Sequence, residues 1–213
     1  MTSPARHTSN DSSSDTQTLI LYTALREFSE KGFDGATARE IANRAGVNHG
    51  LIRYYFGSKE KLWRAAVDLA FAELRTGLDL SEGDPTAVDD PDRIRLLIRS
   101  YVHYVAHRPE FVRLMHDEGK RKGPRMRWMV DRHVKPLFAS MTKMMKRSQG
   151  MGFLPRGIDP IHFHYILAGS AGLVFHQAEE CRRLTGGDPF DEAFVEAHAR
   201  AVEHLFLGPP EQE

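Results

Sequence analysis

The sequence predicts an all-α protein, and three observations carry this prediction. Apolar residues recur at the three- and four-residue spacing of a buried helix face in nearly every segment of the chain. Five prolines stand where helices are expected to begin, and three of them follow an aspartate that can cap the helix. No stretch alternates apolar and polar residues with the period of two that marks a β-strand. Helices joined by turns are therefore the expected elements.

The chain is expected to begin with a disordered tail and an amphipathic helix. Residues 1–15 are rich in Ser, Thr, Asn and Asp and contain no apolar run, so they predict a disordered tail and no secretory signal. Residues 16–30 place Ile20, Ala24 and Phe28 on one stripe. This stripe predicts the first helix.

Two short capped helices with a glycine between them are expected next. Thr37 and Glu40 have the spacing of a capping box, and Gly46 can end the first helix in a left-handed conformation. Asn48 is a preferred N-cap for the second helix, which turns Ile52 inward. The residues left for its outer surface and edges are His49, Gly50, Leu51, Arg53, Tyr54 and Tyr55. Two helices joined in this way form a helix-turn-helix, whose second helix can enter the DNA major groove.

The local charge of this segment supports a DNA-binding surface, although the charge of the whole chain does not. The protein has 29 basic and 29 acidic side chains, so no global field attracts it to nucleic acid. Residues 37–64, however, hold six Lys and Arg side chains against Glu40 and Glu60 only. Phosphate contacts supply much of the affinity for DNA, and such a patch can make them. A solvated helix surface is the alternative explanation for the charge alone.

Prolines and a breaker-rich stretch divide the rest of the chain. A helix is expected to start after Ser58 and to run to residue 74, and the acidic residues 79–92 are interpreted as a linker. The further helices are expected over about 91–107, 109–118, 124–149, 160–184 and 189–207. Pro136 should kink or split the third of these. We therefore predict one domain over residues 16–75 and a larger helical domain over residues 76–213.

The ordered residues of the first part resemble a known family. The matching residues are Phe28, Glu30 to Phe33, Thr37, Ile41, Ala42, Ala45 to Val47, Gly50, Tyr54, Phe56, Ser58 to Glu60 and Leu62. In this order they resemble the N-terminal DNA-binding domain of the TetR family of bacterial transcriptional regulators. The resemblance covers residues 16–74, a little over a quarter of the chain.

The resemblance implies roles for particular residues of the helix-turn-helix. The residues equivalent to Thr37 and Lys59 hold DNA phosphates in similar proteins. The implied groove-facing or wall-facing set is Asn48, His49, Gly50, Leu51, Arg53, Tyr54 and Tyr55. Asn48 stands where serine is usual, and Arg53 stands where tyrosine is frequent. Arg53 can pair with guanine O6 and N7, worth about 1–3 kcal/mol of discrimination, although a phosphate contact is the alternative.

The second domain is predicted to bind a small-molecule effector of unknown identity with a large apolar part. Residues 124–149 carry a methionine stripe, and methionine can line an adaptable pocket, although such a stripe also suits an ordinary core. The resemblance implies an effector cavity in this domain. The candidate lining residues are Phe111, Met115, Trp128, Met141, Phe163, Phe175 and His176.

The last two helices are predicted to form a homodimer interface. Small residues over 168–172 let another helix approach closely, and the last helix has a wide apolar stripe. The candidate interface residues are Gly169, Gly172, Phe194, His198, Ala201, Val202 and Leu205. Packing within one chain is the alternative. The resemblance implies a four-helix bundle between two copies, and a two-fold dimer suits a pseudo-palindromic operator.

A second basic segment has no assigned role. Residues 113–147 contain eleven basic side chains against Asp117, Glu118 and Asp131. The excess of basic charge suits a second nucleic-acid patch or a site for an anionic effector. Arg125, Arg127 and Lys135 are the first candidates for binding such an effector. A solvated helix surface is the alternative explanation.

Enzymatic function is not expected, and neither is a metal or cofactor. The single cysteine, Cys181, excludes an internal disulfide, suits a reducing cytoplasm and has no identifiable catalytic base. His103 and His107 have the spacing of two metal ligands on a helix, but no third ligand follows at a telling distance. The longest apolar stretch, 161–175, is shorter than the ~20 residues a membrane span needs.

The sequence thus predicts a cytoplasmic homodimeric regulator, with operator DNA as its partner and no membrane contact. Its activity is predicted as repression that a small-molecule effector relieves. The alternatives are a DNA-binding protein without an effector and a His-dependent metallohydrolase.

Overall fold

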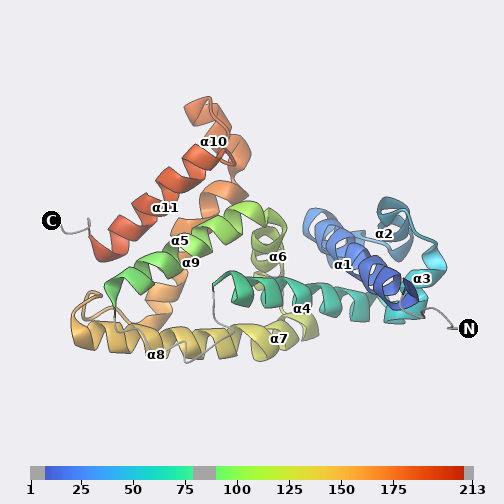
Figure 1. Ribbon diagram of the computed structural model, residues 1–213, viewed down its shortest axis with the longest axis horizontal. Helices are drawn as coiled ribbons and strands as arrows, with labels where there is room; N and C mark the ends of the chain where they lie inside the picture. The colour runs from blue at the N-terminus through green and yellow to red at the C-terminus, as the bar shows by residue number, and fades with distance from the viewer. Residues whose placement is uncertain (1–7, 79–89, 209–213) are drawn as a thin grey trace, which may run out of the picture.

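The computed structural model describes residues 8–78 and 90–208, and every regular element within these ranges is helical (Figure 1). The α-helices are α1 (Thr8–Gly35), α2 (Ala38–Ala45), α3 (His49–Phe56), α4 (Lys59–Gly77), α5 (Pro91–His107), α6 (Pro109–Gly119), α7 (Pro124–Met129), α8 (Lys135–Met151), α9 (Pro160–His176), α10 (Ala178–Thr185) and α11 (Glu192–Leu207). One π-helix, η1 (Val130–Val134), joins α7 to α8. The all-α prediction is confirmed.

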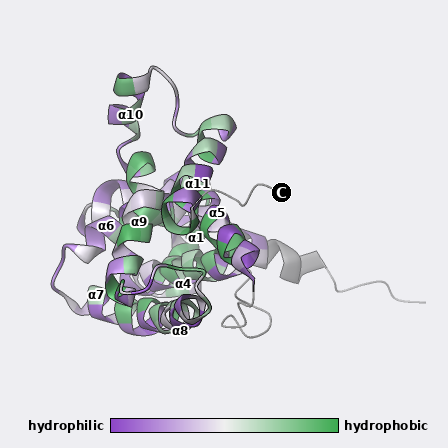
Figure 2. Ribbon diagram, turned by 90° about the vertical axis from the view of Figure 1, so that its left-hand side faces the viewer, coloured by the Kyte–Doolittle hydropathy of each residue, from purple (hydrophilic) through white to green (hydrophobic). Residues whose placement is uncertain are grey.

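Helices α1 to α3 lie at one end of the molecule, and α4 runs from this end toward the remaining helices (Figure 1). Helix α10 projects from the body and stands apart in the perpendicular view as well (Figure 2). None of the helices in the described ranges has the length and apolar content to cross a membrane.

The N-terminal core is built from one face of each of the first four helices. Its members with almost no exposed surface are Ile20, Leu25, Phe28, Ile41, Ile52, Leu62 and Trp63. Complete burial of a side chain of this size contributes about 1.5–3 kcal/mol. These contacts, more than helix propensity, hold the two short helices α2 and α3 in place, because isolated helices of this length are unstable in water.

A buried carboxylate ties α2 to α1. Glu27 is only 3% exposed, and it contacts Arg44 of α2 at 2.5 Å and Lys31 at 2.9 Å. Arg44 also bonds Glu30 at 2.7 Å, so one guanidinium joins two turns of α1. Burial acts to raise the pKa of Glu27, but the hydrogen bonds and charges of Arg44 and Lys31 outweigh it and hold the pKa below its ordinary value.

Helix α4 continues the core into the C-terminal part. The ring of Phe71 lies edge-on to the ring of Phe111 of α6, with centroids 5.2 Å apart. The hydroxyl of Tyr104 in α5 donates to the carbonyl of Ala70 at 2.7 Å. Gly77, at the end of α4, also lies against Tyr104, where a Cβ would be 3.6 Å from the ring. The same helix is therefore part of both halves of the molecule.

The C-terminal helices pack around α5, α9 and α11. Arg95 of α5 bonds the buried Glu203 of α11 at 2.9 Å, which fixes the two helices side by side. Gly172 of α9 lies against Val112 of α6, where a Cβ would be 3.5 Å from the valine side chain. The small residue therefore permits close packing within one chain.

Four of the five helix starts marked by proline are found, and the fifth is corrected. The expected prolines begin helices α5, α6, α7 and α9. Asp90 and Asp159, each directly before its proline, are the N-caps of α5 and α9. The helix expected over 189–207 instead begins at Glu192, because Asp188 accepts a hydrogen bond from the Phe190 amide in a turn and pairs with Arg182 at 2.9 Å.

The helix expected over 160–184 is broken at Gln177, which separates α9 from α10. The buried apolar run of α9 ends at Phe175, whose ring packs on Phe190 from the returning chain at 5.7 Å. The chain turns there because the following segment has few apolar residues to bury. Pro136 splits its helix as expected, since α7 ends in the π-turn of η1, where the amide of Lys135 bonds the carbonyl of Val130.

The predicted tail and linker are only partly within the described residues. Helix α1 begins at Thr8, so residues 8–15 belong to a helix and not to the expected disordered tail. Gly32, with φ of 69°, interrupts α1 close to the expected helix end at residue 30. Residues 1–7 and 79–89, which cover the rest of the tail and most of the linker, lie outside the described ranges.

Replacing Glu27 with glutamine should lower the free energy of unfolding by about 1–3 kcal/mol at neutral pH, because Arg44 and Lys31 would face a neutral partner. The folded pKa of Glu27 lies below its unfolded value, so its stabilisation is present above the unfolded pKa and disappears as pH falls through the folded pKa. Urea unfolding across this acid range is the measurement. An equal pH dependence for wild type and E27Q would contradict the role of Glu27.

Candidate nucleic-acid interface and effector cavity

The caps predicted for the helix-turn-helix are present. Thr37 Oγ1 accepts from the Glu40 amide at 3.2 Å, and the Glu40 carboxylate accepts from the Thr37 amide at 3.2 Å, which completes a capping box. Gly46 ends α2 with φ of 67°, a left-handed conformation that favours glycine. Asn48 caps α3 by accepting from the Gly50 amide at 2.8 Å. These local bonds set the angle at which α3 leaves α2.

The outer surface of α3 has the composition of a major-groove reader. His49, Gly50, Arg53 and Tyr54 are exposed, whereas Leu51 and Tyr55 are half-buried. Tyr54 is 79% exposed, which is unusual for a large aromatic residue without a partner surface. Arg53 has no ion-pair partner among the residues that the structure describes. Ile52 faces inward as expected.

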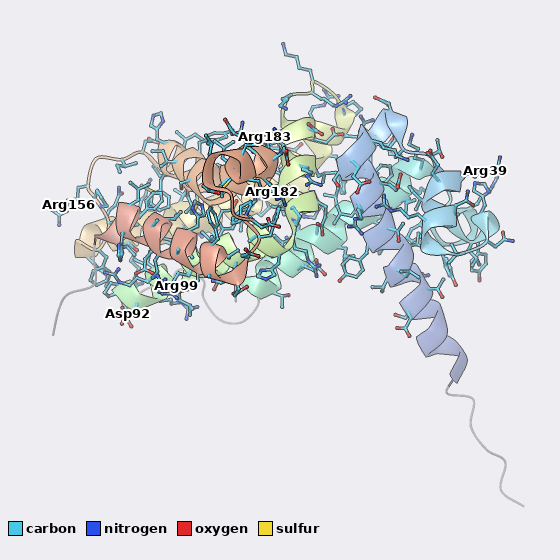
Figure 3. The ribbon with its side chains drawn as sticks, turned by 90° about the horizontal axis from the view of Figure 1, so that it is seen from above. Arg39, Asp92, Arg99, Arg156, Arg182 and Arg183 are labelled. Atoms are coloured by element: carbon cyan, nitrogen blue, oxygen red, sulfur yellow. The ribbon has the colours of Figure 1, made fainter. Side chains whose placement is uncertain are left out.

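The two residues implied to hold phosphates lie near one turn. Lys59, in the first turn of α4, donates to the carbonyl of Asp34 at 3.4 Å, and its ammonium lies 4.6 Å from the ring centre of Phe33. Thr37 follows three residues after Asp34. On α2, Arg39 extends from the outer edge of the molecule (Figure 3). This corner of the N-terminal unit is therefore cationic and accessible.

A cluster of aromatic and arginine side chains joins the N-terminal unit to the C-terminal helices. The guanidinium of Arg125 lies 3.9 Å from the ring centre of Phe33, and the rings of Trp63 and Trp128 are 5.7 Å apart. The guanidinium of Arg64 lies over the Trp128 ring, 5.2 Å from its centre. Contacts of this kind contribute about 0.5–2 kcal/mol each. No sequence pattern indicated this cluster, because its members come from distant parts of the chain.

A second contact joins α4 to the π-turn. His133 is 3% exposed and stacks on Phe71 with ring centres 4.5 Å apart. Its Nε2 lies 2.9 Å from the Asp68 carboxylate of α4. Burial lowers the pKa of His133, and the charge of Asp68 only partly offsets this. A neutral His133 therefore packs like an aromatic residue against α4.

A cavity of about 120 Å³ lies among α4, α5, α8 and α9. Its lining residues are Leu74, Leu78, Ile94, Leu97, Ile98, Tyr101, Leu137, Phe138, Ser140, Met141, Met144, His164, Leu167 and Ala168. All but Tyr101, Ser140 and His164 are apolar. None of these three side chains has a hydrogen-bond partner among the described residues. Burial raises the pKa of Tyr101 to about 12 and lowers that of His164, so both are neutral near pH 7.

Of the seven predicted lining residues, only Met141 lies on this cavity. Phe111 packs between Phe71 and Tyr104, and Trp128 packs on Trp63. The remaining four, Met115, Phe163, Phe175 and His176, pack on the core or pair with Phe206, Phe190 and His116. Helical spacing identified the buried faces but not the neighbours that leave a cavity between them.

The predicted dimer residues divide into buried and exposed sets. Gly172 and Val202 are buried within their own chain, and His198 Nε2 lies 2.9 Å from the Ser170 carbonyl. Leu205 is 64% exposed and Ala201 is exposed. Gly169 and Phe194 are half-buried. The dimer interface therefore stays a prediction, and it now rests on the residues of α9 and α11 that are not buried within their own chain.

The histidine pair considered for metal binding is engaged by acidic residues. His103 Nε2 lies 3.2 Å from Glu196, and His107 Nε2 lies 3.6 Å from Glu192. Within residues 8–78 and 90–208, no group of three or more His, Cys, Asp or Glu side chains could hold a metal ion.

Two family models match this chain. The model of bacterial regulatory proteins of the tetR family matches residues 20–66, and the model of the tetracyclin repressor-like C-terminal domain matches residues 91–205. The chain belongs to the TetR family. Both halves of the structure are thereby assigned, because the first match contains the helix-turn-helix and the second contains α5 to α10 and most of α11.

Individual relatives of this TetR-family protein are named as transcriptional regulators. The HTH-type transcriptional repressor NicS of Pseudomonas putida is 33% identical over 114 residues, which are 51% of this chain and 50% of NicS. The regulator RutR of Escherichia coli is 27% identical over 193 residues, covering 88% and 87% of the two chains. The chain spans about half the length of the first curated relatives it matches. The fold is shared with SCO4942 of Streptomyces coelicolor, with a TM-score of 0.66 at 23% identity, covering 91% and 99% of the two chains.

Replacing Thr37 with alanine should cost about 1 kcal/mol of unfolding free energy, because the Glu40 amide would have no side-chain acceptor. Urea unfolding measures the difference, and Thr37→Ser is the control because it retains the hydroxyl. Equal stability of all three proteins would show that the capping box does not hold α2.

Proposed function

We propose that this protein is a DNA-binding transcriptional repressor that a small apolar effector releases from its operator. It would act in the cytoplasm as a homodimer, with residues 16–75 as the DNA-binding domain and residues 76–213 as the effector-binding and dimerisation domain. The supporting observation is that helix α4 reaches both the proposed DNA-binding surface and the cavity. Lys59 lies in the first turn of α4, while Leu74 and Leu78 at its other end line the cavity.

The DNA contacts of the proposal come from two sets of residues. Thr37 and Lys59 hold backbone phosphates and set the position of α3. The groove-facing set consists of Asn48, His49, Gly50, Leu51, Arg53, Tyr54 and Tyr55. The exposure of Arg53 and Tyr54 supports this assignment, because Arg53 has no ion pair within the described chain and most of the Tyr54 ring is open to solvent although its edge meets Tyr55. The cap formed by Asn48 uses its amide oxygen to accept from the Gly50 amide, which leaves both N–H donors of its side-chain amide available to a base.

The chemistry of the cavity indicates the class of effector. Its walls are almost wholly apolar, and its polar groups are neutral hydroxyl and imidazole groups that lack partners in the described chain. A hydrocarbon body with one uncharged hydrogen-bonding group fits these walls. The free volume of about 120 Å³ is below the roughly 300–1,000 Å³ of most ligand sites. A ligand must therefore widen the cavity, and Met141 and Met144 have the flexible side chains that permit it.

Widening the cavity provides the coupling that release requires. An effector shifts the equilibrium only if it binds the two conformations unequally. The observed narrow cavity would bind a large ligand poorly, so the ligand favours a state in which Leu74 and Leu78 have moved. Helix α4 has 19 residues and is about 28 Å long, so as a rigid element it can transmit a tilt at the cavity end toward Lys59 at the other end.

Dimerisation through exposed and half-buried residues of α9 and α11 completes the proposal. The reduced interface set is Gly169, Phe194, His198, Ala201 and Leu205. Two copies related by a two-fold axis would present two α3 helices to the half-sites of a pseudo-palindromic operator. A tilt of both α4 helices would then change the separation of the two α3 helices and break this match.

Replacing Arg53 with alanine should remove a preference for a G·C pair at one position of each half-site, at a cost of about 1–3 kcal/mol for that base pair. Selection of bound fragments from a random pool at one fixed salt concentration measures the preference. An even reduction of affinity over all sequences would indicate a phosphate contact instead. An unchanged footprint and affinity would exclude Arg53 from the interface.

Primary n-alkanols of increasing chain length should bind the cavity and raise the unfolding temperature of the protein, because they combine an apolar body with an uncharged hydroxyl. Tyr101→Phe removes only one cavity hydroxyl and should weaken binding about 2- to 10-fold, the equivalent of one hydrogen bond. Ala168→Leu fills the cavity and should abolish binding. Stabilisation that is equal in all three proteins would place the ligand elsewhere.

The conformational part of this prediction has a separate measurement. Spin labels on Arg39→Cys, in a Cys181→Ser background, report the distance between the two DNA-binding units of a dimer. The distance should change when a bound alkanol releases DNA. DNA release without any change in this distance would contradict the tilt of α4, and failure of every ligand to release DNA would favour a DNA-binding protein without an effector.

A further inference from the structure

A short basic loop of the C-terminal domain lies beside the N-terminal unit. The loop between α6 and α7 contains Lys120, Arg121 and Lys122 in succession, and all three are exposed. No acidic residue occurs from 119 to 130, so the local charge is strongly positive. Figure 3 shows this loop next to the C-terminal end of α1. We name residues 120–122 the basic loop.

One residue connects the basic loop to the corner that holds Lys59. The guanidinium of Arg121 lies 3.3 Å from the carboxylate of Asp34, while the carbonyl of the same Asp34 accepts from Lys59 at 3.4 Å. Thr37 caps the next helix and follows Asp34 by three residues. The basic loop is therefore adjacent to both residues assigned to DNA phosphates, although it is more than 60 residues away from either in the sequence.

The position of the loop is fixed by neighbours that do not neutralise its lysines. Arg125, just after the loop, lies over Phe33 and contacts the buried Glu118 at 3.4 Å. Lys122 has no ion pair among the residues that the structure describes. Lys120 has one exposed pair with Asp117 at 3.7 Å, a geometry that contributes little. Arg121 neutralises Asp34, which would otherwise repel phosphates at this corner.

Neighbouring cations that are weakly paired within the protein are stabilised by an external polyanion. DNA presents one negative charge per about 1.7 Å of its axis, and each phosphate bound by a lysine releases condensed counterions. The exposure of Lys120 and Lys122 suits a surface of this kind better than an enclosed site for a small anion, which would bury its ligands. The arrangement also gives a role to part of the basic excess over residues 113–147, which lies outside the helix-turn-helix.

We propose that Lys120 and Lys122 of the basic loop bind the DNA backbone beside the phosphates held by Thr37 and Lys59. The proposal rests on the proposed function, because it requires the protein to bind DNA. It makes the C-terminal domain part of the DNA interface. Since the loop leads through α7 and η1 into α8, which lines the cavity, a contact made by the loop couples operator binding directly to the effector domain.

The test compares two double variants of the whole chain that remove the same charge. Lys120→Ala with Lys122→Ala removes the proposed contacts. Lys143→Ala with Lys146→Ala removes two exposed lysines of α8, which lies at the opposite end of the molecule from α1 to α3 (Figure 1). Binding to a duplex of about 30 base pairs, roughly three helical turns, is measured over a range of salt concentrations. The duplex is the one that the wild-type protein selects from a random pool.

The expected result is a change in salt dependence for the first variant only. The slope of log K against log salt should become shallower by about 0.9 for each phosphate that the variant no longer neutralises, and affinity at 0.1 M salt should fall about tenfold for each such phosphate. Lys120→Arg with Lys122→Arg should keep the wild-type slope because the charges remain. Equal slopes for the wild type and both alanine variants would overturn this proposal, as would an equal change in the two alanine variants.

The outcome for the proposed function is separate. A wild-type protein that selects and binds no duplex would overturn DNA binding itself, and the role of the loop with it. A wild-type protein that selects and binds a duplex, combined with an unchanged salt slope for the Lys120 and Lys122 alanine variant, would overturn the contact of the basic loop and leave DNA binding through α3 intact. Circular dichroism of each variant confirms that the comparison is between folded proteins.

Discussion

The structure depends on the burial of one helix at both of its ends. Helix α4 places Leu62 and Trp63 in the core of the helix-turn-helix unit and Phe71 and Leu74 in the core of the C-terminal helices. Each of these side chains contributes about 1.5–3 kcal/mol or more when fully buried, so neither half can release α4 without a large decrease in stability. A change in packing at one end must therefore be accommodated by movement of the helix or by its neighbours, and this constraint makes α4 the physical basis of coupling.

The contacts around α4 differ in kind along its length, and the difference has a functional meaning. Near Trp63, the cation–aromatic cluster of Arg125 and Phe33 fixes the N-terminal unit against α7. Near Asp68, the π-turn presents the neutral ring of His133. At Leu74, which is itself buried, the helix also borders the cavity. Close packing resists displacement, whereas a cavity lined by methionine permits it. Movement is thus easiest at the end of α4 that is farthest from α3.

Charge is used differently in the two halves of the molecule. In the core of the N-terminal unit, Glu27 is buried with Arg44 and Lys31, and the pairing links α1 to α2. At the surface, the exposed cations Arg53 and Lys122 have no ion pair within the described chain. The described residues that line the cavity carry neither sign of charge near neutral pH. A zero net charge over the chain therefore coexists with a locally positive face, and the average conceals the feature that matters for a polyanionic partner.

Features that depend on residues a few positions apart could be predicted from the amino-acid sequence. The capping box of Thr37 and Glu40, the cap of Asn48, the prolines at helix starts and the split at Pro136 are all local, because hydrogen bonds and dihedral preferences act within about one helical turn. The family and the outward residues of α3 follow from these.

Other features depend on which helix faces meet across the fold, and these required the three-dimensional arrangement. Met141 lines the cavity while Phe163 and Phe175 do not, and Val202 faces inward. The basic loop lies beside the corner of Lys59 through the shared contact with Asp34. Periodicity along a helix shows that one face is buried, but the identity of the neighbour is set by packing between segments that are distant in the sequence.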